Sequence, residues 1–139
     1  MGVRVRVRLR AGSAEVETSA LVNSGYEVEE PEVLLPRRLA EYLGLELGPP
    51  VARAATYETP FGFQRVVLVP RALAVHLEGV CAEVAGVSAA VADFEREVLI
   101  SDALAEALGI QLISIARGLW RHSDDPPDSL RESASPEYW

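Results

Sequence analysis

The chain has 139 residues, of which 49% are hydrophobic, and this length allows one compact domain with a real core rather than two. Thirteen basic against twenty-one acidic residues give a net charge of −8, which argues against nucleic acid as a partner because phosphate contacts need cations. No apolar run approaches the ~20 residues of a membrane helix, and neither a signal peptide nor a cysteine framework is visible. We therefore expect a cytoplasmic protein with no membrane contact, no metal site and no cofactor.

The first 22 residues predict a β-hairpin. Residues 3–10 read VRVRVRLR, which places four apolar side chains on one face of a strand and four arginines on the other. Residues 11–13 supply a turn, and residues 14–22 alternate again. The arginine row is expected to be a solvated face paired with Glu15 and Glu17, the alternative being a basic binding strip.

Two short helices and a series of β-rich segments follow. Pro36 precedes RRLAEYLG, where the proline suits a first helical turn and Gly44 suits the helix end. Residues 52–59 and 63–69 flank the turn sequence Thr-Pro-Phe-Gly and predict a long hairpin. Further strands are expected at residues 73–77, 80–84, 87–92 and 97–100, followed by a second helix at 102–108 that Ser101 or Asp102 caps.

An internal repeat links the two predicted helices. Residues 39–47 (LAEYLGLEL) and 104–112 (LAEALGIQL) are identical at six of nine positions. Each copy follows an apolar strand that ends in a small polar residue, within ALVNSG in the first half and VLISDA in the second. The repeat favours a domain built from two related halves, the alternative being chance similarity between short leucine-rich helices.

The sequence ALVNSG at residues 20–25 is the best candidate for a functional site, because an apolar strand ends there in a short polar residue, a hydroxyl and a glycine. Together with Leu34-Leu35-Pro36, the helix LAEYLGL, the long hairpin and the late VLIS before LAEALGI, it resembles the retroviral-type (retropepsin-like) aspartic proteases over about residues 3–115. The resemblance implies an all-β fold, a retropepsin-like acid-protease β-barrel with two short helices.

The same resemblance implies how the site would work. Peptide bonds are hydrolysed in this family by a water held between two carboxylates, one from each of two such loops, so a homodimer is implied. Asn23 takes the position of the catalytic Asp, Ser24 matches the hydroxyl that braces the paired loops, and Gly25 matches the turn glycine. Phe61 and Gly62 are implied to lie near the tip of a flap that contacts an extended polypeptide.

The chain departs from the family pattern at two positions. An amide at position 23 cannot act as a general base, so we expect no aspartic endopeptidase turnover from this chain as written. Asn23 fits a natural non-catalytic relative, an engineered inactive form of an active enzyme, or a misleading alignment of short motifs. Ser101 replaces a late glycine of the family, and its Cβ would crowd the loop if the backbone there had positive φ. The competing class is a non-enzymatic small β-barrel that serves as an interaction or scaffolding module.

Two polar segments remain. The acidic run of Glu27, Glu29, Glu30 and Glu32 is interpreted as a solvated loop in preference to a metal or paired-carboxylate site. Residues 1–115 are expected to form the retropepsin-like domain, and residues 116–139 a polar C-terminal tail. From His122 onward we expect this tail to be mostly disordered unless Tyr138 and Trp139 dock on a partner.

Overall fold

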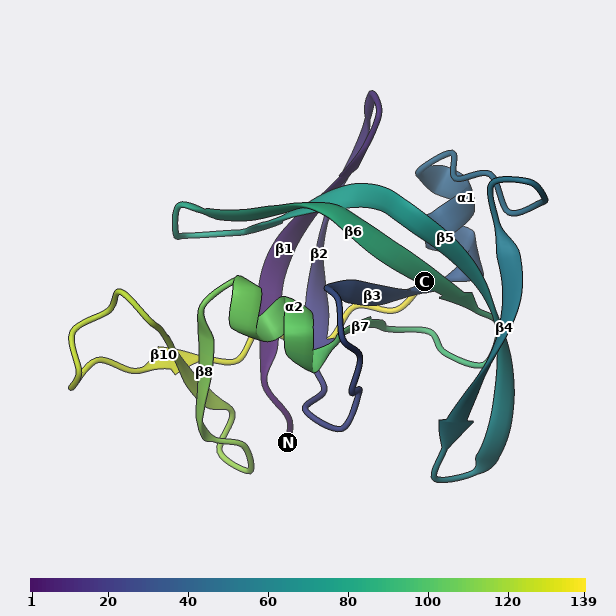
Figure 1. Ribbon diagram of the computed structural model, residues 1–139. Helices are drawn as coiled ribbons and strands as arrows, with labels where there is room; N and C mark the ends of the chain where they lie inside the picture. The colour runs from purple at the N-terminus through teal and green to yellow at the C-terminus, as the bar shows by residue number, and fades with distance from the viewer.

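The computed structural model describes all residues, 1–139, and the protein is mostly β with two short helices (Figure 1). The main strands are β1 (Arg4–Ala11), β2 (Ala14–Val22), β3 (Glu32–Pro36), β4 (Arg53–Thr59), β5 (Gly62–Leu77), β6 (Ala82–Ala92) and β7 (Val98–Ile100). The helices are α1 (Arg37–Tyr42) and α2 (Asp102–Ala107), and the chain ends in β8 (Ile110–Ser114), β9 (Leu119–His122) and β10 (Arg131–Glu132). Neither helix is long and apolar enough to cross a membrane.

Six of the strands close into a mixed β-barrel in the order β1-β2-β7-β3-β6-β5. Antiparallel pairing of residues 7–10 in β1 with residues 74–77 in β5 closes the ring. The pairs β2–β7 and β3–β6 are parallel, and the other neighbours are antiparallel. β4 lies outside the ring and pairs only with the first part of β5. The predicted β-barrel with two short helices is therefore confirmed at this level.

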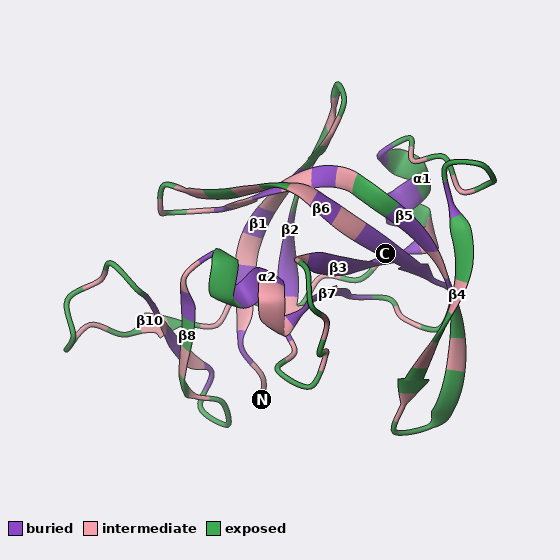
Figure 2. Ribbon diagram, viewed as in Figure 1, coloured by how far each residue is buried: buried purple, intermediate pink, exposed green.

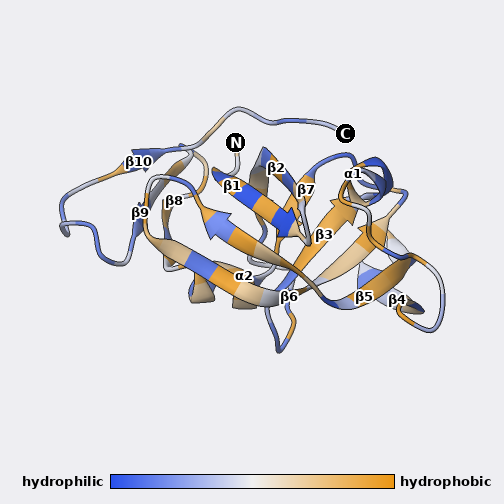
Figure 3. Cartoon of the chain, turned by 90° about the horizontal axis from the view of Figure 1, so that it is seen from above, coloured by the Kyte–Doolittle hydropathy of each residue, from blue (hydrophilic) through white to orange (hydrophobic).

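The predicted β1–β2 hairpin is confirmed, and its alternation separates core from surface. Val3, Val5, Val7 and Leu9 are at most 1% exposed and belong to a single large apolar core. The bands of high and low hydropathy along β1 are visible in Figure 3. The arginines on the opposite face form ion pairs with carboxylates of β2 and of neighbouring segments: Glu15, Glu17, Glu78, Glu83, Glu97 and Glu137. The charges of the arginine row are thus paired with carboxylates, and the predicted pairing with Glu15 and Glu17 is confirmed.

β5 and β6 are longer than the sequence predicted. Residues 73–77 continue β5, because a register shift between Val69 and Leu73 places Pro70 and Arg71 in a bulge where proline need not donate a ladder hydrogen bond. Arg71 adopts φ 49° there. The sequence likewise predicts two separate strands at residues 80–84 and 87–92, whereas in the structure residues 82–92 form the single strand β6. Gly86, at φ 66°, lies where the register shifts a second time.

The internal repeat maps onto two strand–helix units. α1 follows β3 and α2 follows β7, and Leu39 and Leu104 are the fully buried leucines of the two helices. Gly44 and Gly109 end the helices at φ 74° and φ 78°, a conformation that glycine adopts at little cost. Buried residues concentrate in the barrel strands and on the inner faces of both helices, whereas the β4–β5 tip is exposed (Figure 2).

The predicted polar tail, residues 116–139, with disorder expected from His122 onward, contains the two short strands β9 and β10. β9 pairs with β8 and β10 pairs with β9, and the residues that follow cross over the barrel (Figure 3). Ala134 N–H donates to the Arg4 carbonyl at 2.8 Å, and the Trp139 indole donates to Thr18 Oγ1 at 3.1 Å. Trp139 also packs against the main core. Backbone hydrogen bonds, the polar side chains of Ser133 and Glu137, and the Trp139 ring hold this segment, and none of these contacts leaves a periodic apolar pattern in the sequence.

Candidate functional site

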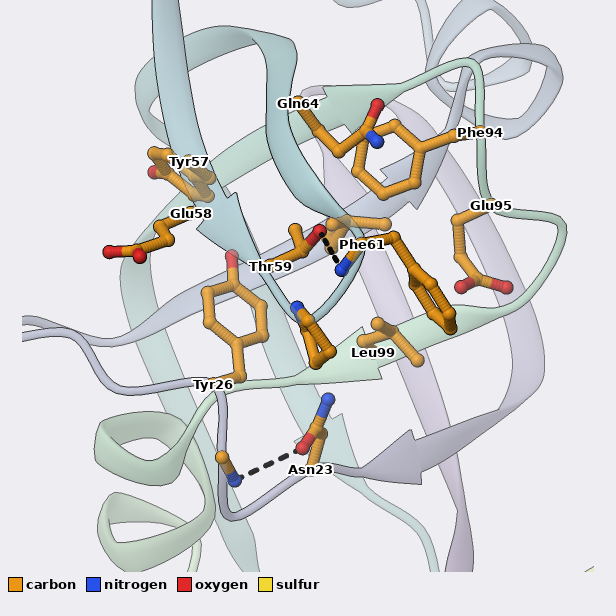
Figure 4. Close-up of a pocket in the computed structure, with 13 residues that line it drawn as sticks. Asn23, Tyr26, Tyr57, Glu58, Thr59, Phe61, Gln64, Phe94, Glu95 and Leu99 are labelled. Carbon is orange, nitrogen blue, oxygen red and sulfur yellow. Dashed lines mark hydrogen bonds between the residues drawn. The ribbon is translucent and has the colours of Figure 1, made fainter.

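The residue at the candidate catalytic position, Asn23, lies in a tight turn directly after β2. Its N–H donates to the Ile100 carbonyl at 3.1 Å, which extends the parallel pairing of β2 with β7. Its side-chain Oδ1 accepts from Gly25 N–H at 3.0 Å, and its carbonyl accepts from Tyr26 N–H at 3.0 Å (Figure 4). An Asx turn of this kind fixes the side chain of residue 23. We call residues 23–26 the Asn23 turn.

The end of β7 and the start of α2 brace the Asn23 turn. Ser101 is fully buried and caps α2, its Oγ accepting from Leu104 N–H and from Glu32 N–H, each at 3.2 Å. Its φ is −68°, so the expected crowding by a Cβ at this position does not arise. Asp102 N–H donates to the Tyr26 carbonyl at 2.9 Å, which ties α2 to the turn.

The β4–β5 hairpin supplies the other wall of the site. At its tip, Thr59 Oγ1 accepts from Phe61 N–H at 3.2 Å and donates to the Gly62 carbonyl at 2.8 Å. Gly62 has φ 107°, a conformation that side chains rarely adopt and that explains the glycine. Phe61 is 93% exposed and Phe63 is 74% exposed. The rings of Phe61 and Phe63 are thus both exposed to solvent at the tip of the hairpin.

A groove of about 470 Å³ lies between the Asn23 turn and the hairpin. Its lining combines apolar and aromatic side chains with a few polar groups: Asn23, Gly25, Tyr26, Leu34, Tyr57, Glu58, Thr59, Pro60, Phe61, Gln64, Phe94, Glu95 and Leu99 (Figure 4). Of the residues predicted for the site, Asn23, Gly25 and Phe61 meet here. Gly62 belongs to the tip but not to the lining, and Ser24 lines separate hollows beside α2 and β8.

A buried carboxylate, which no sequence pattern marks, connects the two walls. Glu32 was predicted to be solvated with the acidic run, yet it is 7% exposed at the start of β3. Its Oε2 accepts from the hydroxyl of Tyr26 in the turn and from that of Tyr57 on β4, the latter at 2.8 Å. The tyrosine rings meet edge to face with centroids 6.5 Å apart. No local pattern marks this triad, because its members come from three separate segments.

The environment of the triad keeps both tyrosines protonated. Burial, followed by the charge of Glu32 and the hydrogen bond to it, raises the pKa of Tyr26 far above its usual value. Burial and the hydrogen bond to Glu32 also raise the pKa of Tyr57. Both phenols therefore act as hydrogen-bond donors that hold the hairpin against the turn. The chain contains no group of three or more His, Cys, Asp or Glu side chains that could hold a metal ion.

Comparison with known proteins adds no assignment. Neither a protein-family model nor a curated protein matches this sequence. The class that the fold itself defines is a mostly β protein with a closed six-stranded mixed barrel and two short helices. The groove between turn and hairpin is the feature of this barrel from which a function can be argued.

Proposed function

We propose that this chain is a retropepsin-like domain that acts as one half of a homodimer and holds an extended polypeptide between the Asn23 turn and the β4–β5 hairpin. The observation that carries the proposal is that the position of the family's catalytic acid and the tip of its flap line one groove. Asn23 and Phe61 come from distant parts of the sequence. Their meeting in one groove is what the resemblance requires.

The edge of the hairpin supports an extended ligand. β4 is the terminal strand of the seven-stranded sheet and pairs with β5 alone, so its other edge offers free backbone groups. An extended peptide can add to such an edge as a further strand, with backbone hydrogen bonds giving affinity and alternate side chains entering pockets. Tyr57, Thr59 and Phe61 on this segment line the groove.

The chemistry expected of the site follows from the amide of Asn23. Activation of a water needs a group that accepts its proton, and loss of general-base catalysis typically lowers a rate by about 10²- to 10⁴-fold. A carboxylate at position 23 would accept the Gly25 N–H bond that Asn23 Oδ1 now accepts at 3.0 Å. Because that bond favours an ionised carboxyl, the turn suits the family's acid. The chain as written is therefore proposed to bind polypeptide without cleaving it.

Apolar surface beside the turn supports pairing of two copies. Ser24 faces a hollow that Val3, Leu112 and Ile115 also line, and Ile115 is 55% exposed. Ile113 on β8 is 46% exposed, and β8 is an edge strand of the small C-terminal sheet. A second copy seated here would bring two Asn23 turns together, where two amides can hydrogen-bond without the repulsion of two carboxylates.

The proposal is tested by restoring the acid and by measuring size. Wild type, Asn23→Asp and the control Asn23→Ala are assayed for cleavage of a denatured protein mixture at acid pH, with and without pepstatin. We expect pepstatin-sensitive cleavage by Asn23→Asp alone, and a dimer in sedimentation analysis. Absence of cleavage in all three proteins would refute the endopeptidase scaffold. A strict monomer would refute the shared groove and favour the non-enzymatic interaction module.

A further inference from the structure

The groove carries two carboxylates without cationic partners. Glu58 lies at the end of β4 and Glu95 lies in the loop between β6 and β7, on opposite sides of the groove (Figure 4). Neither forms an ion pair within the chain, and no arginine contributes to the lining. The Oε1 of Glu95 accepts from the N–H groups of Arg96 and Glu97, at 3.1 Å and 3.3 Å. These bonds orient the carboxylate and leave its other oxygen free.

The outer face of the barrel gives the contrast. There the carboxylates beside β1 are matched by the arginine row, for example Glu15 by Arg8 at 3.2 Å and Glu83 by Arg10 at 3.4 Å. The carboxylates beside β1 thus have arginine partners, whereas Glu58 and Glu95 at the groove have none. An incoming group of positive charge would find complementary, unoccupied acceptors at both sides of the groove.

The middle of the groove is apolar. Leu34 and Leu99 lie among the lining, together with the rings of Tyr26, Phe61 and Phe94. Phe61 and Phe94 are 93% and 45% exposed, so their faces are available to a ligand. Such a surface favours a large aliphatic or aromatic side chain, and its rings can also attract a neighbouring cation.

We propose that the groove selects extended peptide segments in which a large apolar residue is flanked on both sides by Lys or Arg, with Glu58 and Glu95 as the specificity-determining residues. This inference rests on the polypeptide binding proposed above and adds the chemical class of the ligand. The apolar centre supplies burial, and the two carboxylates supply discrimination between cationic, neutral and anionic flanks. Exposed ion pairs of this kind change affinity by about two- to fivefold each, and salt weakens them.

The test compares three fluorescein-labelled decapeptides with a central Phe-Leu pair and flanks of Lys, Gln or Glu. Fluorescence anisotropy measures their binding to wild type, Glu58→Gln and Glu95→Gln. We expect affinity to fall from the Lys to the Gln to the Glu peptide. Each variant should lose about two- to fivefold for the Lys peptide and keep its affinity for the Gln peptide. The matched control is Glu46→Gln, an exposed carboxylate outside the groove lining, which should leave all three affinities unchanged.

The outcomes separate this inference from the function on which it rests. Equal binding of the three peptides by wild type would overturn the charge selection and leave the peptide groove standing. An equal loss in Glu46→Gln and Glu58→Gln would assign the preference to net charge and would also overturn it. Failure of every peptide to bind a folded wild type, as judged by circular dichroism, would overturn both proposals.

Discussion

Replacement of Tyr26 by Phe removes one hydrogen bond from the triad that joins the Asn23 turn to the hairpin. The Glu32 carboxylate is 7% exposed and accepts from the hydroxyls of both Tyr26 and Tyr57. Phenylalanine keeps the ring and its edge-to-face contact with Tyr57 but leaves the buried carboxylate with one phenol donor. The substitution therefore measures the hydrogen bond rather than the packing.

The expected loss of stability is large for the removal of a single hydroxyl group. A hydrogen bond to a charged group contributes about 1.5–3 kcal/mol, and loss of the donor leaves part of a buried charge unsatisfied. With an unfolding entropy of about 2 cal/mol/K per residue, this loss lowers the Tm of a chain of 139 residues by about 5–10 °C. The control Tyr42→Phe, at a residue that is 67% exposed, should leave the Tm unchanged.

The alkaline pH dependence gives a second measurement. Burial and the charge of Glu32 raise the folded-state pKa of Tyr26 above its ordinary value of 10.0. The unfolded tyrosine loses its proton above pH 10 while the folded one keeps it, so this stabilisation is complete below pH 10 and declines as the pH rises further. The slope for one such group approaches about 1.4 kcal/mol per pH unit. Tyr26→Phe should lose this part of the pH dependence.

Thermal and urea unfolding followed by circular dichroism, from pH 7 to pH 11, measure both effects. A decrease in Tm of less than about 2 °C in Tyr26→Phe would refute this prediction, because the hydrogen bond would then contribute less free energy than bonds to charged groups usually do. The prediction is also refuted if wild type and variant lose stability in parallel above pH 10.

Two further predictions concern ion pairs. Hydrogen bonds from Arg131 lower the pKa of Asp125 below its ordinary value, so their stabilisation is present above about pH 4 and lost as the pH falls below it. Asp125→Asn should flatten the acid side of a Tm profile between pH 2 and pH 6, and an unchanged profile would contradict this assignment. Arg4→Met leaves the carboxylate of Glu97, a residue 6% exposed, without its cation and should lower the free energy of unfolding in urea by about 3–5 kcal/mol. Arg10→Met removes one ion pair between two exposed side chains, Arg10 and Glu83, and should cost less than about 1 kcal/mol, so equal losses in the two variants would refute the distinction.

The parts of the fold that depend on neighbouring residues could be predicted from the sequence. The strict alternation of residues 3–10 determined both the β1–β2 hairpin and its core face, because successive strand side chains point to opposite sides. Glycines and small polar residues at the ends of apolar segments determined both helices and the β4–β5 turn. A local pattern also pointed to Asn23 as a candidate site residue, whereas Phe61 was implied only by the resemblance to retropepsin-like proteases.

Only the tertiary structure decided which segments meet. The parallel pairs β2–β7 and β3–β6 join strands that are far apart in the sequence, and their arrangement places the Asn23 turn opposite the hairpin. It also buries Glu32, whose sequence neighbours are the acidic residues of a loop, and it docks Trp139 on the barrel. Periodicity reports the environment of a residue along its own segment. The hydrogen bonds that Glu32 accepts from two distant tyrosines, and those that hold the C-terminal segment on the barrel, depend on contacts between segments that no local pattern records.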